Sequence, residues 1–206
     1  VEIDPSLERL DLFGSAYSGR SEQTDANGVT TNIADALLWT PICEYVPSIV
    51  PDFSGTFNGN NVEIVGLNAG SSNASDTLTC VGFIGRANGA TITNVNIGAG
   101  GRVTGNQTVG GVVGLTQSSC TISHCSNAAT VRAYRQGAGG IAGQMSKGGA
   151  IESCTNSGEV YAATGNAAGI VYKVTEVTVR DCSNEANVTA VSGTSSRLAA
   201  GIVSQA

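Results

Sequence analysis

The sequence predicts an all-β fold, a right-handed parallel β-helix (a solenoid) of about 29-residue coils with a small N-terminal capping segment. The first observation is an internal repeat: segments that open with glycine begin 29 residues apart three times, and a fifth follows after 32. These segments are Gly82–Gly85, Gly111–Gly114, Gly140–Gly143, Gly169–Tyr172 and Gly201–Ser204. The second observation is that short β-type stretches lie between them, without the i, i+3, i+4, i+7 spacing of an amphipathic helix. Equivalent strands of successive coils would pair about 4.8 Å apart, and the usual chirality of parallel connections predicts the right-handed winding.

The front of the chain differs from the rest in composition. Residues 1–80 carry 11 acidic and 2 basic residues and all four prolines, whereas residues 81–206 carry 5 acidic and 8 basic residues. We therefore expect residues 1–50 to form an acidic capping segment and residues 51–206 to form the β-helix. A short helical turn is expected at Ser6–Leu10, and the apolar run Ala36–Trp39 is expected to cover one end of the solenoid.

Several further columns keep the period of the repeat. Stacked asparagine amides can bond to the copies above and below, and asparagine tolerates the left-handed backbone that tight corners need. We therefore interpret the recurring glycines, cysteines and asparagines as a structural ladder through the core. The columns are Gly111, Gly140 and Gly169; Ile92, Ile122, Ile151 and Val179; Cys125, Cys154 and Cys182; Asn127, Asn156 and Asn184; and Val131, Val160 and Val188.

The six cysteines show no metal-binding or redox spacing. Three in one column cannot all pair with one another, so we expect free, buried thiols that act as small hydrophobic residues. Cys43 with Cys80 is the one pair for which a disulfide is worth testing.

Three segments of the chain carry a resemblance to a known family. Phe53-Ser54-Gly55-Thr56-Phe57-Asn58-Gly59-Asn60-Asn61-Val62-Glu63-Ile64-Val65-Gly66-Leu67 resembles the first part of proteins with GLUG repeats, F-x-G-x-F-D-G-N-G-x-x-I-x-G-L, with Asn58 and Asn61 in place of the usual Asp and Gly. Gly139–Gly143 and Ser153–Val160 resemble the later G-G-I-x-G and N-C-x-N-x-G-x-V signatures, and Trp39–Ile42 resembles the W-T-P-I that often precedes them. The resemblance covers roughly residues 39–206.

This resemblance implies a β-helical, cell-surface or secreted bacterial protein of the kind found in Bacteroidetes, where such proteins are often described as adhesins. Some larger proteins, including IgA-directed metallopeptidases, carry the repeats beside a catalytic domain. The repeat itself is not known as a catalyst, so the resemblance assigns no catalytic residue.

The residues themselves argue against most chemistry. The formal charge of −6 is unlike that of a nucleic-acid-binding protein, and no apolar run is long enough to span a membrane. The single histidine, His124, excludes the H-E-x-x-H zinc site and is expected to be exposed beside an inward Cys125. We predict no catalytic, cofactor-binding or metal-binding residues and no cofactor. Glu152 aligns with Arg180 of the next coil, which predicts a weak surface ion pair.

The leading functional hypothesis is a non-enzymatic, extracytoplasmic β-helix that presents a binding surface for adhesion to a host protein or a glycan. Arg132 and Tyr161 align in neighbouring coils and are a candidate surface contact, either as a cation–π pair that covers a strand or as part of a binding surface. The loops Asn68–Thr79, Gly98–Thr108 and Tyr134–Ala138 are candidate contact regions.

Two alternatives stay open. One is a polysaccharide lyase or glycoside hydrolase that uses acids from the front half of the chain, such as Asp35, Asp52 and Asp76. The other is a passive spacer within a longer surface protein. Gly201–Ser204 opens a coil that is not completed, so we expect either a continuing chain or an oligomer partner to pack against that end.

Overall fold

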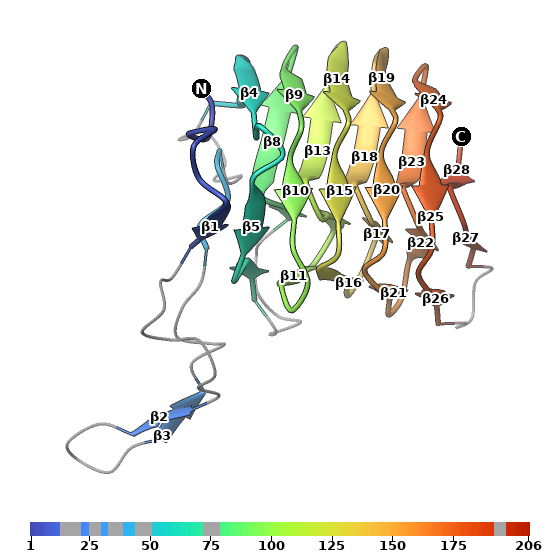
Figure 1. Cartoon of the computed structure of the whole chain (residues 1–206). Coiled ribbons are helices and arrows are strands. Elements are labelled where there is room, and N and C mark those ends of the chain that lie inside the picture. The colour runs from blue at the N-terminus through green and yellow to red at the C-terminus, as the bar shows by residue number, and fades with distance from the viewer. Residues whose placement is uncertain (13–21, 25–29, 33–38, 44–50, 72–78, 192–196) are drawn as a thin grey trace.

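The computed structural model describes residues 1–12, 22–24, 30–32, 39–43, 51–71, 79–191 and 197–206, and it confirms the parallel β-helix. Five coils follow one another along one axis, and each contributes one strand to each of five parallel sheets (Figure 1). The coils consist of β4–β8, β9–β13, β14–β18, β19–β23 and β24–β28. Within the described residues, no helix is long enough and apolar enough to cross a membrane.

The five sheets are numbered here in the order in which the chain visits them. Sheet 1 consists of β4 (Thr56–Asn58), β9 (Thr91–Thr93), β14 (Cys120–Ser123), β19 (Gly149–Glu152) and β24 (Thr178–Arg180). Sheet 2 consists of β1 (Arg9–Asp11), β5 (Glu63–Val65), β10 (Asn96–Ile97), β15 (Ser126–Asn127), β20 (Thr155–Asn156) and β25 (Ser183–Asn184). Sheet 3 consists of β6 (Asn68–Gly70), β11 (Arg102–Gly105), β16 (Thr130–Ala133), β21 (Val160–Ala162) and β26 (Val188–Ala190).

The last two sheets complete each coil. Sheet 4 consists of β7 (Cys80–Val81), β12 (Thr108–Gly110), β17 (Gly137–Gly139), β22 (Asn166–Ala168) and β27 (Ala199–Ala200). Sheet 5 consists of β8 (Ile84–Asn88), β13 (Val113–Gln117), β18 (Ala142–Ser146), β23 (Val171–Thr175) and β28 (Val203–Gln205). Outside these sheets, β2 (Glu22–Thr24) and β3 (Thr30–Asn32) form an antiparallel pair.

The register between coils matches the columns of the sequence repeat. Ile122 pairs with Ile92 on one side and with Ile151 on the other, and Ile151 pairs with Val179. The three isoleucines are fully buried, so each coil stacks the same apolar side chain on its neighbour. Burying one such side chain contributes about 1.5–3 kcal/mol, and the stacked columns therefore supply the main stabilisation of the solenoid.

Tight corners of the coils need a left-handed backbone, and we expected the asparagine column to supply it. The column does not have this conformation. One positive-φ column is instead Asn94, His124, Ser153 and Asp181, with φ between 52° and 56°, and a second is Ser118, Lys147 and Glu176. Asn127, Asn156 and Asn184 lie in β15, β20 and β25 and are absent from the positive-φ positions, so that part of the expectation is wrong. His124 is exposed beside the buried Cys125, and asparagine, aspartate and histidine are the side chains that best tolerate this conformation.

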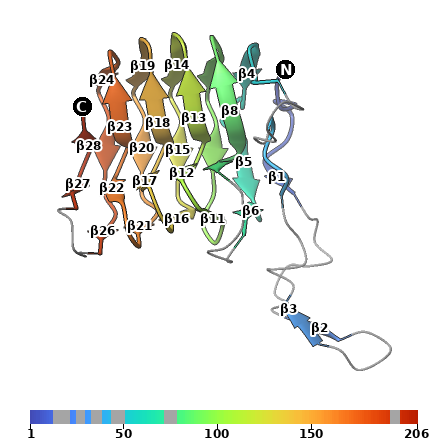
Figure 2. The same ribbon diagram turned by 180° about the vertical axis from the view of Figure 1, so that it is seen from behind.

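The described front residues add backbone pairs to the first coil. Strand β1 pairs in parallel with β5, and isolated bridges join Glu2, Trp39, Ile42 and Phe53 to β4, β6 and β8 (Figure 2). The helical turn expected at Ser6–Leu10 is wrong, because Arg9–Asp11 is extended along the open edge of β5. That edge offers a row of backbone partners, which outweighs the local helix preference. The division at residue 50 stays a prediction.

Aromatic side chains cover the core at this end. The ring of Trp39 stacks on Phe83 with centroids 5.2 Å apart, and its indole N–H donates to the Phe83 carbonyl at 3.1 Å. Phe57 meets Phe83 edge-on at 5.5 Å. The run Ala36–Trp39 was expected to cover an end of the solenoid, and Trp39 lies there, whereas residues 36–38 lie outside the described residues.

Candidate ligand-binding surface

The cysteine column lies inside the core. All six cysteines are free, so the disulfide considered for Cys43 and Cys80 is not formed. Cys125 and Cys154 are buried and Cys182, in the last coil, is half-buried. Each thiol in the column lies close to a carbonyl oxygen, 3.2 Å for Cys125 to Ser123 and 3.3 Å for Cys154 to Glu152. Hydrogen bonding with Cys125, together with burial, raises the pKa of Cys154 to about 12.

We therefore expect Cys154 to resist alkylation by iodoacetamide while the protein is folded, because the thiolate is the reactive form. Peptide mass spectrometry at about pH 8, before and after unfolding in urea, measures this, and Cys43 provides the half-buried comparison. Because the folded-state pKa exceeds that of the unfolded chain, stability is expected to fall as pH rises from 9.0 toward about 12. Labelling of Cys154 in the folded protein as fast as that of Cys43 would contradict a closed core.

The asparagine column is a continuous hydrogen-bonded ladder. The side-chain amide of Asn127 donates to Asn156 Oδ1 at 2.9 Å, and that of Asn156 donates to Asn184 Oδ1 at 2.8 Å. Each amide also donates to the carbonyl two residues ahead, on Ala129, Gly158 and Ala186. Asn127 and Asn156 are almost fully buried, so these bonds satisfy groups that water cannot reach.

The glycine column makes room for this ladder. A Cβ added at Gly111 would collide with the side chain of Asn127 and with the carbonyl of Gly140. The same relation recurs for Gly140 with Asn156 and for Gly169 with Asn184. The two columns are therefore one feature: glycine lets the backbone approach the inward amide of the next coil. They hold the fold, and all but the half-buried Asn184 are buried, so we do not assign them as a binding site.

The ionisable groups on the outside are mostly scattered. Glu152 and Arg180 form the expected cross-coil ion pair at 2.8 Å on an exposed surface. Asp52 forms an ion pair with Arg86 at 3.0 Å, and both side chains are largely buried, so the contact fastens the residues just before β4 to β8. Asp35 and Asp76 lie outside the described residues. Within the described ranges, no three His, Cys, Asp or Glu side chains come together in a group that could hold a metal ion.

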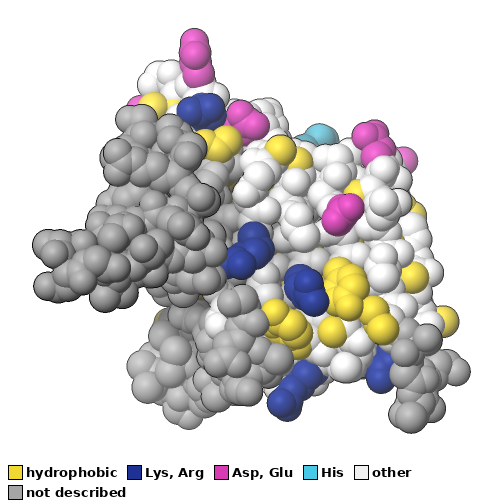
Figure 3. Space-filling view, turned by 90° about the horizontal axis from the view of Figure 1, so that it is seen from below, with side chains coloured by type: hydrophobic (Ala, Val, Ile, Leu, Met, Phe, Trp, Pro, Cys, Tyr) yellow, Lys and Arg dark blue, Asp and Glu magenta, His cyan; other side chains and the backbone are white. Residues whose placement is uncertain are grey.

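The outer face of sheet 3 is where aromatic and basic side chains gather. Arg132 pairs in register with Tyr161, and its guanidinium carbon lies 4.4 Å from the centroid of that ring. The same carbon lies 5.5 Å from the centroid of Tyr134, so the cation lies near two rings. Arg102 and Arg135 lie beside this cluster, on β11 and just beyond β16. Figure 3 views this side, where basic side chains surround hydrophobic ones.

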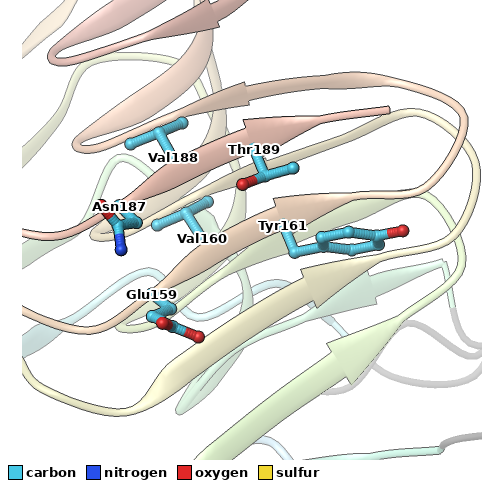
Figure 4. A pocket seen from close by; sticks show the side chains of 6 residues that line it. All are labelled: Glu159, Val160, Tyr161, Asn187, Val188 and Thr189. Carbon is cyan, nitrogen blue, oxygen red and sulfur yellow. The ribbon is translucent and has the colours of Figure 1, made fainter. Parts of the chain in front are cut away.

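A shallow pocket of about 260 Å³ adjoins the Arg–Tyr cluster (Arg132, Tyr134 and Tyr161). It is lined by Glu159, Val160, Tyr161, Asn187, Val188 and Thr189, which come from β21, β26 and the residues just before them (Figure 4). Thr189 follows Tyr161 in the same outward column, so a large ring is succeeded by a short side chain.

Of the sequence candidates, Arg132 and Tyr161 are brought together on a surface. The sequence named Tyr134 as the first residue of the candidate loop Tyr134–Ala138 but did not pair it with Arg132, and it did not single out Glu159, Asn187 and Thr189. The pairing was detectable in principle, because residues two positions apart face the same side of a strand. The loop Tyr134–Ala138 contributes Tyr134 to the cluster. Gly98–Thr108 is largely strand, since it contains β11, and Asn68–Thr79 begins with β6, whereas its residues 72–78 lie outside the described residues.

Comparison with known proteins supports the fold. A family model for the GLUG motif matches residues 105–132, which confirms the resemblance for one circuit of the coil. Among solved structures, the chain is similar to the crystal structure of a candidate immunoglobulin A1 protease from Bacteroides ovatus, with a TM-score of 0.52 and 22% identity. The match covers 83% of this chain and 57% of that one, so this chain spans little more than half of that protein's length. No curated protein matches the sequence.

Proposed function

We propose that this chain is a non-enzymatic, extracytoplasmic module that presents a ligand-binding surface on a rigid β-helix and acts in adhesion to a glycan or a host protein. The observation that carries the proposal is the Arg–Tyr cluster beside the 260 Å³ pocket on sheet 3. A solenoid fixes such side chains through its stacked core while the outward positions vary freely. The GLUG match and the Bacteroides neighbour support an extracytoplasmic location.

The enzyme alternative lacks a comparable observation. Asp52 is the one of these three front-half acids that lies among the described residues, and it is paired with Arg86. Both of its carboxylate oxygens face the guanidinium of Arg86, so this carboxylate makes a fastening contact. We therefore favour binding over catalysis.

Binding to an array of glycans and host glycoproteins tests the proposal. We expect retention of at least one ligand class with dissociation constants near the micromolar to millimolar range that is typical of shallow sites. Incubation with the same polysaccharides, followed by reducing-end and unsaturated-product assays, tests turnover. Product formation would overturn the adhesion proposal in favour of a lyase or hydrolase, whereas no binding to any ligand would favour the passive spacer.

A further inference from the structure

We propose that the outer face of sheet 3 binds an acidic glycan, with Arg132 pairing with the acid group of the ligand and the pocket beside Tyr161 receiving a sugar ring. This inference rests on the proposed binding function and names its ligand class. It draws on three features of the face: its charge, the arrangement of Arg132, and the shape and lining of the pocket.

The charge of this face is positive although the protein as a whole is acidic. Arg102, Arg132 and Arg135 lie on it, and Glu159 is the acidic side chain that lines the pocket. Arg132 and Arg135 are exposed, and neither forms an ion pair with any residue that the structure describes. Exposed guanidinium groups attract an anion and repel a cation.

Arg132 is already arranged for an anionic partner. Its guanidinium lies 4.4 Å from the centroid of Tyr161 and 5.5 Å from that of Tyr134, and such contacts restrain a long side chain. Stacking uses the faces of the guanidinium and leaves its N–H donors at the edge. A carboxylate or sulfate can then accept two parallel hydrogen bonds, the geometry in which arginine binds such groups best.

The pocket favours an acidic sugar over other acidic ligands such as an acidic peptide. Its 260 Å³ lies just below the range of about 300–1,000 Å³ for small-molecule sites, so it suits one ring. Tyr161 offers an apolar surface, and Glu159, Asn187 and Thr189 offer a carboxylate, an amide and a hydroxyl to the hydroxyl groups of a sugar. An acidic peptide would satisfy Arg132 but would leave these hydroxyl-binding groups unused.

Glu159 sharpens the expectation about charge. Its carboxylate can accept hydrogen bonds from sugar hydroxyls, but it also repels an acidic ligand. Glu159→Gln keeps an acceptor and removes the negative charge. We therefore expect this variant to bind an acidic glycan a few-fold more tightly than the native protein, whereas Arg132→Gln should bind it at least tenfold more weakly.

Calorimetric titration of the full chain tests the inference with four probes: galacturonate oligosaccharides for carboxylates, heparin fragments for sulfate esters, maltooligosaccharides as neutral sugars, and polyglutamate as an acidic peptide. We expect binding of one or both acidic probes, weakening as salt is added, and loss of that binding in Arg132→Gln. Lys173→Gln removes the same charge from the outer side of sheet 5 and should bind like the native protein. Thermal unfolding of each variant by circular dichroism establishes that it is folded.

The outcomes separate this inference from the proposed function. If a neutral sugar or a host glycoprotein binds and Arg132→Gln leaves that binding unchanged, the module still binds a ligand but the acidic-glycan site is wrong. If polyglutamate binds as tightly as the acidic sugars, the assignment to glycans is wrong. Equal losses in Arg132→Gln and Lys173→Gln would show a general charge effect and overturn the site. If no probe and no array ligand binds, both proposals fail.

Discussion

Gly140→Ala is expected to destabilise the β-helix by about 3 kcal/mol or more, at or beyond the upper end of overpacking costs. A Cβ at this position would lie within 2.5 Å of Asn156 Oδ1 and would collide with the carbonyl oxygen of Gly169. The carbonyl belongs to the backbone of the next coil, so relief requires that coil to move. Urea unfolding followed by circular dichroism measures the loss as a lower midpoint.

Gly201→Ala is the matched control, because Gly201 occupies the same column in the last coil. A Cβ there meets no atom within 4 Å. We expect no loss of stability, and an increase of up to about 1 kcal/mol from the reduced freedom of the unfolded chain. Equal losses of stability in the two variants would show that steric overlap with Asn156 and Gly169 is not the reason for a glycine at position 140.

Residues that recur by type were predictable from the sequence. The isoleucine, cysteine, asparagine and glycine columns keep one period, and a parallel register stacks like on like. The sequence showed the glycine and asparagine columns separately, and did not show that Gly140 touches Asn156. That contact joins the bend before β18 to strand β20 of the next coil, and no spacing rule encodes it.

Other features were not predictable, for two different reasons. The left-handed corner is filled by Asn94, His124, Ser153 and Asp181, because the position demands a backbone conformation that several polar residues adopt. Strand β1 follows no repeat and forms because the edge of β5 accepts any backbone. The Arg–Tyr cluster lies in outward positions, where the fold imposes no residue type, so the contact of Tyr134 with Arg132 escaped a search for columns.

Asn156→Leu is expected to cost about 3 kcal/mol or more, although leucine has nearly the same shape. The change removes a partner from two buried groups, the amide of Asn127 and the carbonyl of Gly158, and from the half-buried Oδ1 of Asn184. Each unsatisfied group costs about 1–3 kcal/mol. The urea midpoint measures the loss, and a midpoint equal to that of the native protein would show that the ladder contributes little.

Asn156→Asp separates hydrogen bonding from packing through its dependence on pH. A carboxylate there would face two acceptors, the Gly158 carbonyl and Asn184 Oδ1, with no amide to donate. Burial and these neighbours would raise the pKa of the introduced carboxyl above its unfolded value of about 3.9. Folding then favours the protonated form, so the variant should be least impaired near pH 4 and should lose stability as pH rises toward about 8. Asn184→Asp, at the half-buried end of the ladder, should show a smaller dependence. If Asn156→Asp tracks the native protein at every pH, the buried amide ladder does not hold the coils together.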